Sequence, residues 1–474
     1  MPWQGLPITG PAYANVDEVE LSDISPKVQD GYVDAANRTA KRPGLQEYVD
    51  LGTGASVHGL YWWDRHQYAI AVSGGRPYLI ADGTPPIVTT TTGDLLTPDH
   101  PMTFAEHSDG SLLMANGGRI VRLVGTVCTN IADADAPTAV THVLFLDQYI
   151  LANEVGTGRF HYSDVNDPTS WQALSFATAE GKPDLIVAAH TGWREIYLIG
   201  TKSIEIWYND GVTPFSRLQG AFIESGCGAV ASIIMLPPPM NTFVWLDDHR
   251  RVVRANNRLP EVISDPYGRV FSTLSRVDDA RAFTVEAEGW PIYVLSFPTA
   301  QRTFAYNFGK GDWSEWGYWN LSTATYDQYR GNVGCYATSW GKHLVGDHTN
   351  GKVYLASRSV YTDAGNPIRT LRRMGHFDHG SLAFKRSSML KIRAKRGLAN
   401  GSVSDPQMAV RWRDGNRNWS TEHWLSLGQV GDHYLIGKLY GPLGTYETRQ
   451  WEFIHTDDSD FILADAKEDV EMLR

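Results

Sequence analysis

One strand pattern recurs along most of this chain and constrains its fold more than any other feature. Two or three short apolar or aromatic strands are followed by a Gly, Asp or Asn turn and then another strand. The recurring units begin at His58, Met102, His142, Asp184, Ser232, Ala280 and Gly334. Their starts recur at about 40 to 53 residues, the period of a four-stranded propeller blade. We therefore predict an all-β fold with a β-propeller of about seven blades; the alternative is a β-sandwich with long loops.

The blade number and the domain boundaries follow less directly from the pattern. The third and seventh units are the weakest, so six to eight blades are possible. Residues 1–53 have little periodicity and form an expected N-terminal arm, whose strand near Leu45 to Leu51 would close the last blade and protect its edge. The repeat occupies 54–358, and alternating strands in 359–474 predict a small C-terminal β-sandwich-like domain.

Charge and composition exclude several classes of protein. The chain of 474 residues carries a net charge of -11, with a pI of about 5.7, which argues against a simple nucleic-acid binder. Three cysteines, Cys128, Cys227 and Cys335, suit neither a disulfide framework nor a zinc site. The start of the chain lacks the features of a signal peptide, and no apolar run approaches about 20 residues. We expect a soluble protein made in a cytoplasm.

No enzyme signature is present. The sequence has no P-loop, HExxH, GxSxG or CxxC motif. His376, Asp378 and His379 could hold a metal, but such a short cluster is more often polar surface. Acid pairs such as Asp247-Asp248, Asp278-Asp279 and Asp457-Asp458 are more simply turn residues than glycosidase carboxylates. We predict no catalytic residue, no metal and no cofactor.

Tryptophan clusters leave two readings open. They lie at Trp62-Trp63, at Trp313, Trp316 and Trp319, and at Trp412, Trp419 and Trp424. Sugar-binding propellers use such rings as stacking platforms, but aromatic residues at alternate positions also fill blade cores and subunit interfaces. We favour core or interface.

A basic segment follows the repeats. It contains nine cationic residues and one acid, Asp378. This segment is a candidate docking surface for an acidic partner, or a phosphate contact, although a solvated charged face is the more ordinary interpretation. The residues are Arg369, Arg372, Arg373, Lys385, Arg386, Lys391, Arg393, Lys395 and Arg396.

The most specific segment of the chain is Phe160 to Gly211. Polar side chains can bond the amides of a turn here, Pro168 presets its dihedral angle, and Trp171 can pack on the blade. Pro183 and Asp184 lead into a strand that reaches a Trp193-Arg194 hairpin and then Ser203-Ile204-Glu205. The residues of this turn motif are Ser163, Asp164, Asp167, Pro168, Trp171, Pro183, Asp184, Trp193, Ser203 and Glu205.

This motif resembles the packaged-DNA stabilisation proteins, or tail hub (nozzle) proteins, of short-tailed bacteriophages. The resemblance is best over about residues 140 to 230; elsewhere it covers length and layout, with Arg42-Pro43-Gly44 fitting an early Pro-Gly step. It implies a structural virion protein without catalytic residues. It places the protein in the virion tail after synthesis in the cytoplasm of the bacterial host.

The resemblance also implies partners. Such proteins form a homohexameric ring below the portal and its adaptor ring, extend the tail channel, retain packaged DNA and form the conduit for genome ejection. Tail fibres or tailspikes and a needle-like plug attach to them. Six chains of charge -11 would not grip the DNA that passes, so genomic double-stranded DNA would be conducted without sequence recognition.

A rival function belongs to a different class. A carbohydrate-binding or glycan-degrading propeller could serve as a receptor-binding tail component. It would require convergent carboxylates or rows of exposed Trp in a concave site.

Overall fold

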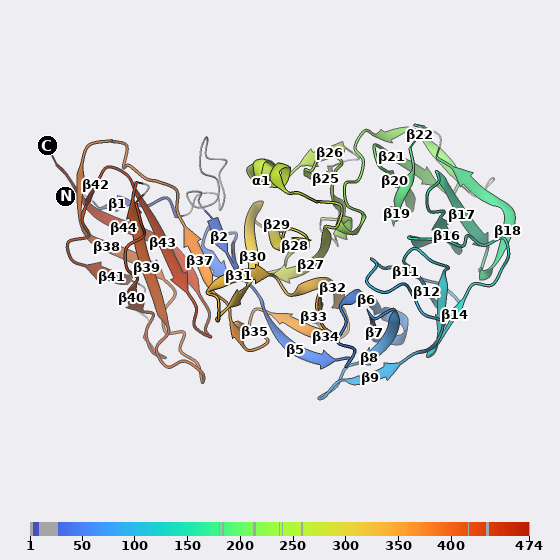
Figure 1. The fold of residues 1–474 in the computed structure, drawn as a ribbon, viewed down its shortest axis with the longest axis horizontal. Helices are drawn as coiled ribbons and strands as arrows, with labels where there is room; N and C mark the ends of the chain where they lie inside the picture. Colours follow the sequence, from blue (N-terminus) through green and yellow to red (C-terminus); the bar gives the residue numbers. More distant parts are fainter. Residues whose placement is uncertain are drawn as a thin grey trace.

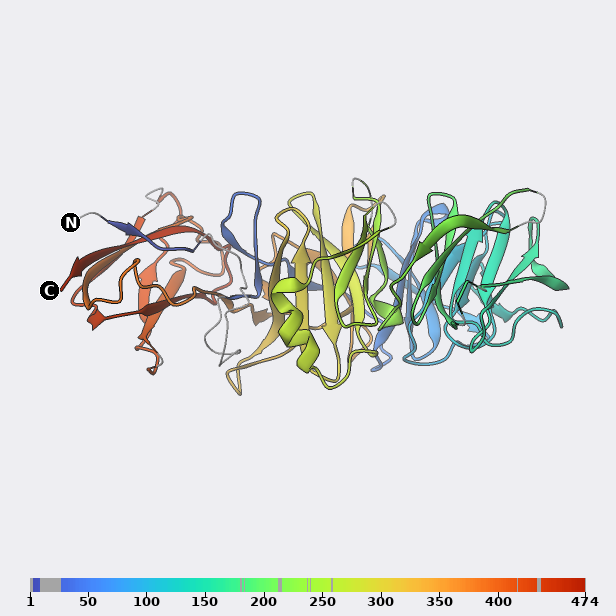
Figure 2. The same cartoon turned by 90° about the horizontal axis from the view of Figure 1, so that it is seen from above.

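A computed structural model describes residues 3–8, 27–179, 181–182, 184–211, 215–236, 238, 240–256, 259–415, 417–432 and 436–473. The fold is almost entirely β. A ring of small sheets lies beside a β-sandwich along the long axis of the molecule (Figure 1). Seen from above, the two parts lie in line (Figure 2). The all-β fold with a β-propeller that the repeat predicts is therefore confirmed.

Seven four-stranded antiparallel blades can be traced in the described residues, and each begins with its innermost strand. The first three are β6 (Val57–Trp63), β7 (Tyr68–Ser73), β8 (Arg76–Ala81) and β9 (Ile87–Thr90); β11 (Thr103–Glu106), β12 (Leu112–Ala115), β13 (Val121–Val124) and β14 (Val127–Asn130), with β10 (Thr92–Gly93) added; and β15 (Val143–Leu146), β16 (Tyr149–Asn153), β17 (Arg159–Asp164) and β18 (Asp167–Thr178).

The next three blades continue the same order. They consist of β19 (Ile186–Gly192), β20 (Glu195–Gly200), β21 (Ile204–Tyr208) and β22 (Ser216–Ile223); β23 (Ile234–Leu236), β24 (Thr242–Leu246), β25 (Val252–Asn256) and β26 (Leu259–Val262); and β27 (Arg281–Ala287), β28 (Trp290–Phe297), β29 (Arg302–Asn307) and β30 (Asp312–Asn320). The helix α1 (Gly268–Thr273) packs between the fifth and sixth blades.

The seventh blade is closed by the N-terminal part of the chain. Its strands β32 (Gly331–Ala337), β33 (Lys342–Asp347) and β34 (Lys352–Ser357) are completed by β5 (Gly44–Asp50), which pairs antiparallel with β34. The predicted closing strand near Leu45 to Leu51 is thus confirmed. Closure links the two ends of the repeat through a main-chain ladder.

Apolar cores between neighbouring blades explain the tryptophan doublets. Each blade buries one face against the preceding blade and the other against the next, because successive strand residues point to opposite faces. Trp63 packs between the first and second blades, whereas Trp62 packs between the seventh and the first. Trp313 and Trp316 divide in the same way on either side of the sixth blade. These four rings are core residues.

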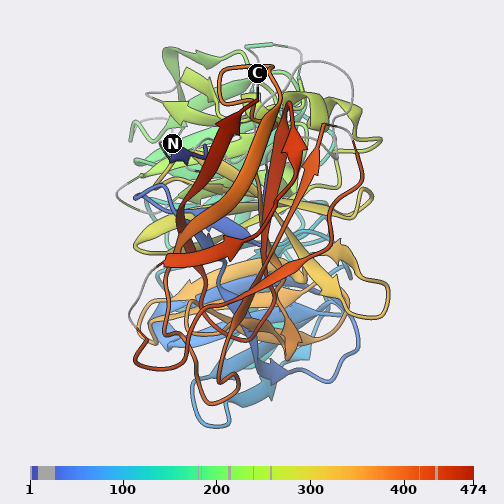
Figure 3. The ribbon, with the colours of Figure 1, turned by 90° about the vertical axis from the view of Figure 1, so that its left-hand side faces the viewer.

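The C-terminal part forms a sandwich of two sheets (Figure 3). One contains β38 (Lys385–Ala394), β41 (Ile436–Tyr440), β42 (Thr445–Tyr446) and β44 (Ile462–Met472). The other contains β37 (Thr370–Arg373), β39 (Gln407–Asp414), β40 (His423–Ser426) and β43 (Arg449–His455). Buried residues of both sheets, including Leu390, Ile392, Trp451 and Phe453, form their common core.

The N-terminal arm contributes strands to both sandwich sheets, which the sequence pattern did not indicate. Strands β1 (Gln4–Gly5), β3 (Gly31–Val33) and β4 (Thr39–Lys41) join the sheet of β44, and β2 (Lys27–Gln29) lies between β30 and β37. The sheet of the sixth blade therefore continues into the sandwich. Short strands β31 (Thr325–Gln328), β35 (Thr362–Asp363) and β36 (Asn366–Pro367) border the junction. The division at residues 53 and 358 stays a proposal.

Candidate interaction surfaces

The basic segment does not form one continuous surface. Arg372, Arg373 and Lys385 are buried. Arg372 Nη2 donates to the Ile8 carbonyl at 2.6 Å, and burial lowers the pKa of Arg372 to about 10. Arg373 pairs with buried Glu452 at 2.8 Å. Their burial removes these side chains from any docking role.

Lys385 is held inside a loop rather than presented to a partner. Its Nζ donates to the carbonyl oxygens of Ser381, Ala383 and Glu447 at 2.5, 2.8 and 2.7 Å. Arg369 also faces inward, because it pairs with Glu422 at 3.2 Å and lies over the ring of Trp319.

The remaining cations of the segment lie on or near the outer face of β38, where Arg386, Arg393 and Lys395 are exposed. Acids stand opposite two of them, since Arg386 is in register with Glu471 and Arg393 with Asp465. Lys395 pairs with Asp460 at 3.2 Å and Arg396 with Asp432 at 3.1 Å. The face is therefore mixed in charge, and its role in docking stays a prediction.

Lys391 differs from the other cations of this face because lysines, and not acids, stand opposite it on both neighbouring strands. Its register neighbours are Lys467 on β44 and Lys438 on β41. Its Nζ lies 3.7 Å from the ring centroid of Trp3, so a cation-π contact holds the start of the chain against the sandwich.

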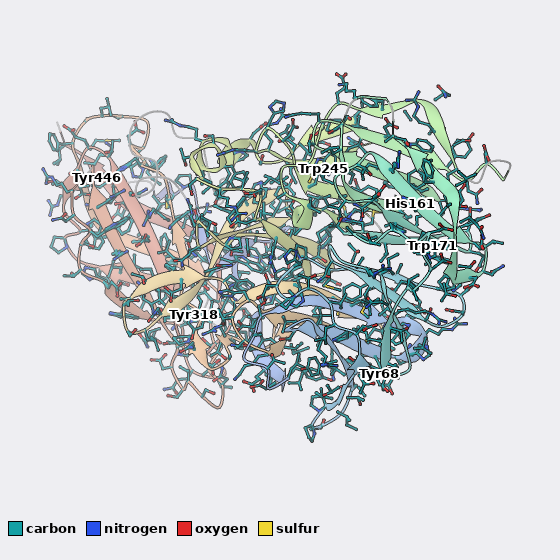
Figure 4. The ribbon with its side chains drawn as sticks, turned by 45° about the vertical axis from the view of Figure 1, so that its right-hand side comes forward. Tyr68, His161, Trp171, Trp245, Tyr318 and Tyr446 are labelled. Atoms are coloured by element: carbon teal, nitrogen blue, oxygen red, sulfur yellow. The ribbon has the colours of Figure 1, made fainter. Side chains whose placement is uncertain are left out.

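The first half of the turn motif shapes the β17–β18 hairpin. The Ser163 hydroxyl accepts the Ile150 N–H at 3.0 Å, and Asp164 accepts Ser170 Oγ at 2.7 Å. Asp167 accepts the Thr169 N–H at 2.9 Å. Trp171 is buried between the second and third blades, and its indole N–H donates to the Pro168 carbonyl at 3.2 Å. Figure 4 shows Trp171 and His161 of this hairpin near each other, on the side away from Tyr446.

The second half of the motif clamps the fourth blade, although Pro183 lies outside the described residues. Asp184 accepts the N–H groups of Thr201, Lys202 and Ser203 at 2.9, 2.8 and 3.0 Å. Burial alone would raise its pKa, but these bonds and those from the hydroxyls hold the pKa below its ordinary value. Buried Glu205 accepts the Trp207 indole N–H at 3.1 Å.

Trp193 borders a cavity between the fourth and fifth blades. Trp193 and Arg194 both have positive φ, 52° and 62°, in the tight turn between β19 and β20. The cavity has a volume of about 460 Å³ and is lined in part by Tyr197, Asn241 and Asn256. The motif residues therefore build turns and blade contacts, and they do not converge on one site.

A side-chain contact links the sixth blade to the loop that precedes the second blade. Arg281, at the start of β27 in the sixth blade, donates to the carbonyl of Asp99 at 2.8 Å. Asp99 precedes β11 of the second blade, so this side chain reaches past the seventh and first blades. Asn332 between them donates to the Val57 carbonyl at 2.8 Å.

Two of the three candidate metal residues, Asp378 and His379, have other partners, whereas both ring nitrogens of His376 are buried without a hydrogen-bond partner in the described residues. His379 Nε2 contacts Tyr446 and Glu468 at 3.0 and 3.3 Å, whereas Asp378 accepts the Gly380 N–H. Asp247 accepts the N–H groups of His249 and Arg251 as a turn residue. In the part of the chain that the structure describes, no group of three His, Cys, Asp or Glu side chains could hold a metal ion.

All three cysteines are free thiols. Cys128 and Cys227 are buried, and Cys335 is partly buried. No helix in the described ranges combines the length and apolar character that a membrane span needs.

Propeller, sandwich and interlocked arm define an all-β protein in which the N-terminal arm joins a propeller to a sandwich. Comparison with known protein families identifies the family to which the chain belongs. The phage stabilisation family, described as Bacteriophage P22 Gp10, beta-propeller, matches residues 28–361, and the chain belongs to this family. It is therefore a structural protein of the phage tail.

More distant comparisons add little. No curated protein matches the chain. Among solved structures, the extracellular domain of BT4673 from B. thetaiotaomicron is 9% identical, with a TM-score of 0.46; the match covers 95% of this chain and 63% of that one. An auxiliary nutrient binding protein from Bacteroides thetaiotaomicron is 10% identical, with a TM-score of 0.37, covering 66% and 75%. Scores this low carry no argument about function.

Proposed function

We propose that this chain forms a cyclic hexameric tail hub, or nozzle, that extends the channel of the portal and its adaptor ring. The ring retains packaged DNA and forms the conduit for its ejection. Membership of the phage stabilisation family supports a tail role. The hexamer and the conduit are our inference.

The family match is the observation that carries the conduit proposal. We place the DNA channel inside a ring of several copies of the chain, because closed rings are the usual product of head-to-tail contacts.

Charge favours passage over binding. Each chain carries -11, and a channel wall formed by such chains attracts no polyanion. The DNA would slide without sequence recognition.

The cations at the C-terminal end of β38 and just after it are proposed contacts for a neighbour such as the adaptor ring, with tail fibres or tailspikes and the needle on other faces. Replacement of Arg393, Lys395 and Arg396 by Glu is expected to lower incorporation into virions. Unchanged copy number and infectivity would exclude these residues from docking. Replacement of Lys202, Arg276 and Lys310, three exposed cations of the propeller, by Glu is the matched control.

The test of the function is native mass and negative-stain symmetry. The purified chain is measured alone and after mixing with a portal-adaptor complex from the same phage. A sixfold ring of 52.7 kDa chains is the expected product. A monomer in both samples would overturn the proposal, and a polysaccharide-depolymerisation assay would then examine the glycan-directed alternative.

A further inference from the structure

A cavity lies on one face of the propeller, between the fourth and fifth blades. It is bordered by Trp193 in the β19–β20 turn, by Asn241 in the β23–β24 turn and by Asn256 at the end of β25. The first and third strands of an antiparallel blade run in the same direction, so the ends of β19, β23 and β25 meet at one face. The volume of about 460 Å³ lies within the range of about 300–1,000 Å³ that is usual for small-molecule sites.

Trp193 occupies a backbone conformation that bulky side chains disfavour. Its φ of 52° lies in the left-handed region, and Arg194 follows with a φ of 62°. Glycine, asparagine and aspartate are the usual residues at the centre of such a hairpin turn, so a tryptophan there is an outlier. Arg194 Nη2 donates to Asp147 at 2.9 Å and ties the turn to the third blade. Backbone strain of this kind concentrates at ligand contacts, which favours a function for the Trp193 ring.

Neighbouring rings fix the Trp193 side chain and still leave it accessible. It makes edge-to-face contacts with Tyr197 and Phe243, at centroid distances of 5.7 and 5.6 Å. Gly192 permits the close approach of Phe243, because an added Cβ would lie 3.0 Å from that ring. Phe243 is buried, whereas 46% of the Trp193 surface is exposed. Trp193 therefore does more than seal the core beneath it, and its ring is a rigid platform.

Polar groups border the cavity beside this platform. Glu195 and Tyr197 lie on the same face of β20, and the Tyr197 hydroxyl donates to Glu195 Oε2 at 2.9 Å. On the side of the fifth blade, Asn256 Nδ2 donates to Glu261 Oε2 at 3.1 Å, and Asn241 is exposed in its turn. A carboxylate accepts hydrogen bonds, whereas an amide both donates and accepts them. Adjacent hydroxyl groups of a ligand can therefore find partners of both kinds.

The charge of the lining narrows the class of ligand. Among the described residues that border the cavity, none is cationic and Glu195 is the single acid. A phosphate or carboxylate ligand would be repelled. One acid is also too few for the usual cleavage of a glycosidic bond, which uses two carboxyl groups. An aromatic face beside amide and carboxylate groups suits a neutral sugar, whose C–H face packs on the ring while its hydroxyls bond the polar groups.

We propose that this cavity binds a neutral saccharide and does not cleave it. One face of a sugar ring stacks on Trp193, and its hydroxyl groups bond Glu195, Asn241 and Asn256. Saccharide binding goes beyond the tail-hub role, because it gives the propeller face a contact with glycans. It requires neither the hexamer nor the adaptor ring, so the isolated chain is sufficient for the test.

Saturation-transfer NMR on the purified full chain tests the site, with glucose, galactose, mannose, rhamnose and N-acetylglucosamine as probes. Transfer to at least one sugar is expected, strongest at the protons of one ring face, as stacking requires. Trp193→Asn should weaken binding of that sugar by about tenfold or more. Asparagine suits a left-handed turn, so this variant should melt no lower than wild type. Lost binding with unchanged melting separates a ligand contact from a structural role.

Two further variants distinguish the cavity from other aromatic surfaces. Trp424→Ala removes an exposed tryptophan of the sandwich and should leave sugar binding unchanged. Glu195→Gln keeps the shape of the side chain but loses its charge, and it should weaken sugar binding by about threefold to tenfold. Equal losses in Trp424→Ala and Trp193→Asn would place the sugar elsewhere and overturn the proposal.

A competing ligand chemistry is a cation held by the aromatic rings and Glu195. Tetramethylammonium is its probe, and binding of this cation without binding of any sugar would overturn the saccharide assignment. Absence of transfer to all five sugars would also overturn it, and would leave the tail-hub proposal standing because ring assembly is measured separately. A sugar that binds a chain unable to form rings would support the site and count against the hexamer alone.

Discussion

Arg42 and Asp363 are 321 positions apart and form a two-pronged ion pair in the interior of the molecule. Arg42 Nη1 donates to Asp363 Oδ1 at 3.0 Å, and Nη2 donates to Oδ2. The same guanidinium donates to Asp30 at 2.8 Å and to the Gly317 carbonyl at 2.9 Å. It therefore ties the N-terminal arm, the sixth blade and the start of the C-terminal part into one junction.

Replacement of Arg42 by Met should strongly destabilise the protein. It leaves Asp30 and Asp363 buried without their cation, a change that costs about 3–5 kcal/mol in comparable buried pairs. Urea unfolding measures the free energy of unfolding. Arg38→Met is the control, because the Arg38–Asp34 pair is partly exposed and worth at most about 1 kcal/mol. Equal losses in the two variants would contradict the role of the junction.

Asp184→Ala should loosen the fourth blade. Three backbone N–H groups lose a charged acceptor, and we expect a loss of about 2–3 kcal/mol in unfolding free energy. Hydrogen exchange of residues 201–203 should rise with it. Asp167→Ala, at an exposed turn, is the comparison and should cost less than about 1 kcal/mol. If the exchange of 201–203 does not change, Asp184 does not clamp this turn.

Stability should fall as the pH is lowered below 6.5, in part because of His142. Burial, with a smaller effect of His190, lowers the pKa of His142 to about 3. The unfolded chain takes up a proton below about pH 6.5 that the native state refuses, so this stabilisation is complete above pH 6.5 and is lost toward pH 3. In His142→Gln the decline between pH 6.5 and 4 should be shallower, by about 1.4 kcal/mol per pH unit at most. Parallel curves would show that His142 makes no contribution.

Lys41 should make the stability of the native state depend on pH above about pH 7. Burial, opposed by Asp458 and Asp457, lowers its pKa to about 7, and its Nζ donates to the Asp457 carbonyl at 2.7 Å. Between pH 7 and 10.5 the unfolded state binds a proton that the native state has lost, so native stability rises with pH. Lys41→Met should flatten this rise in denaturation midpoints measured from pH 7 to 10. A slope identical to that of wild type would refute the assignment.

The repeat carried most of the information about the propeller. The seven predicted unit starts lie within three residues of the first strands of the seven blades, from His58 beside Val57 to Gly334 inside β32. Local alternation and turn residues suffice here because each blade is a meander of neighbouring strands. The closing strand at Leu45 was predictable for the same reason, since an open propeller edge needs a partner.

The basic segment shows where local pattern fails. Its nine cations look alike in sequence, but Arg372 and Lys385 are buried and Arg386 and Arg393 are exposed. Strand alternation predicts that neighbours differ; it does not predict which residues receive carbonyl or carboxylate partners from distant strands. The described residues of the turn motif lie in turns and blade contacts, whereas the exposure of Leu174 depends on a register shift between β17 and β18.

By itself the sequence determined the all-β class, the repeat, its closure and a C-terminal region of alternating strands, because these depend on spacing between residues near one another in the chain. Only the tertiary structure decided that the arm builds both sandwich sheets and that Arg42 meets Asp363. Such features depend on pairing between segments hundreds of residues apart, where backbone hydrogen bonds and burial of charge select the partner and no local spacing records the choice.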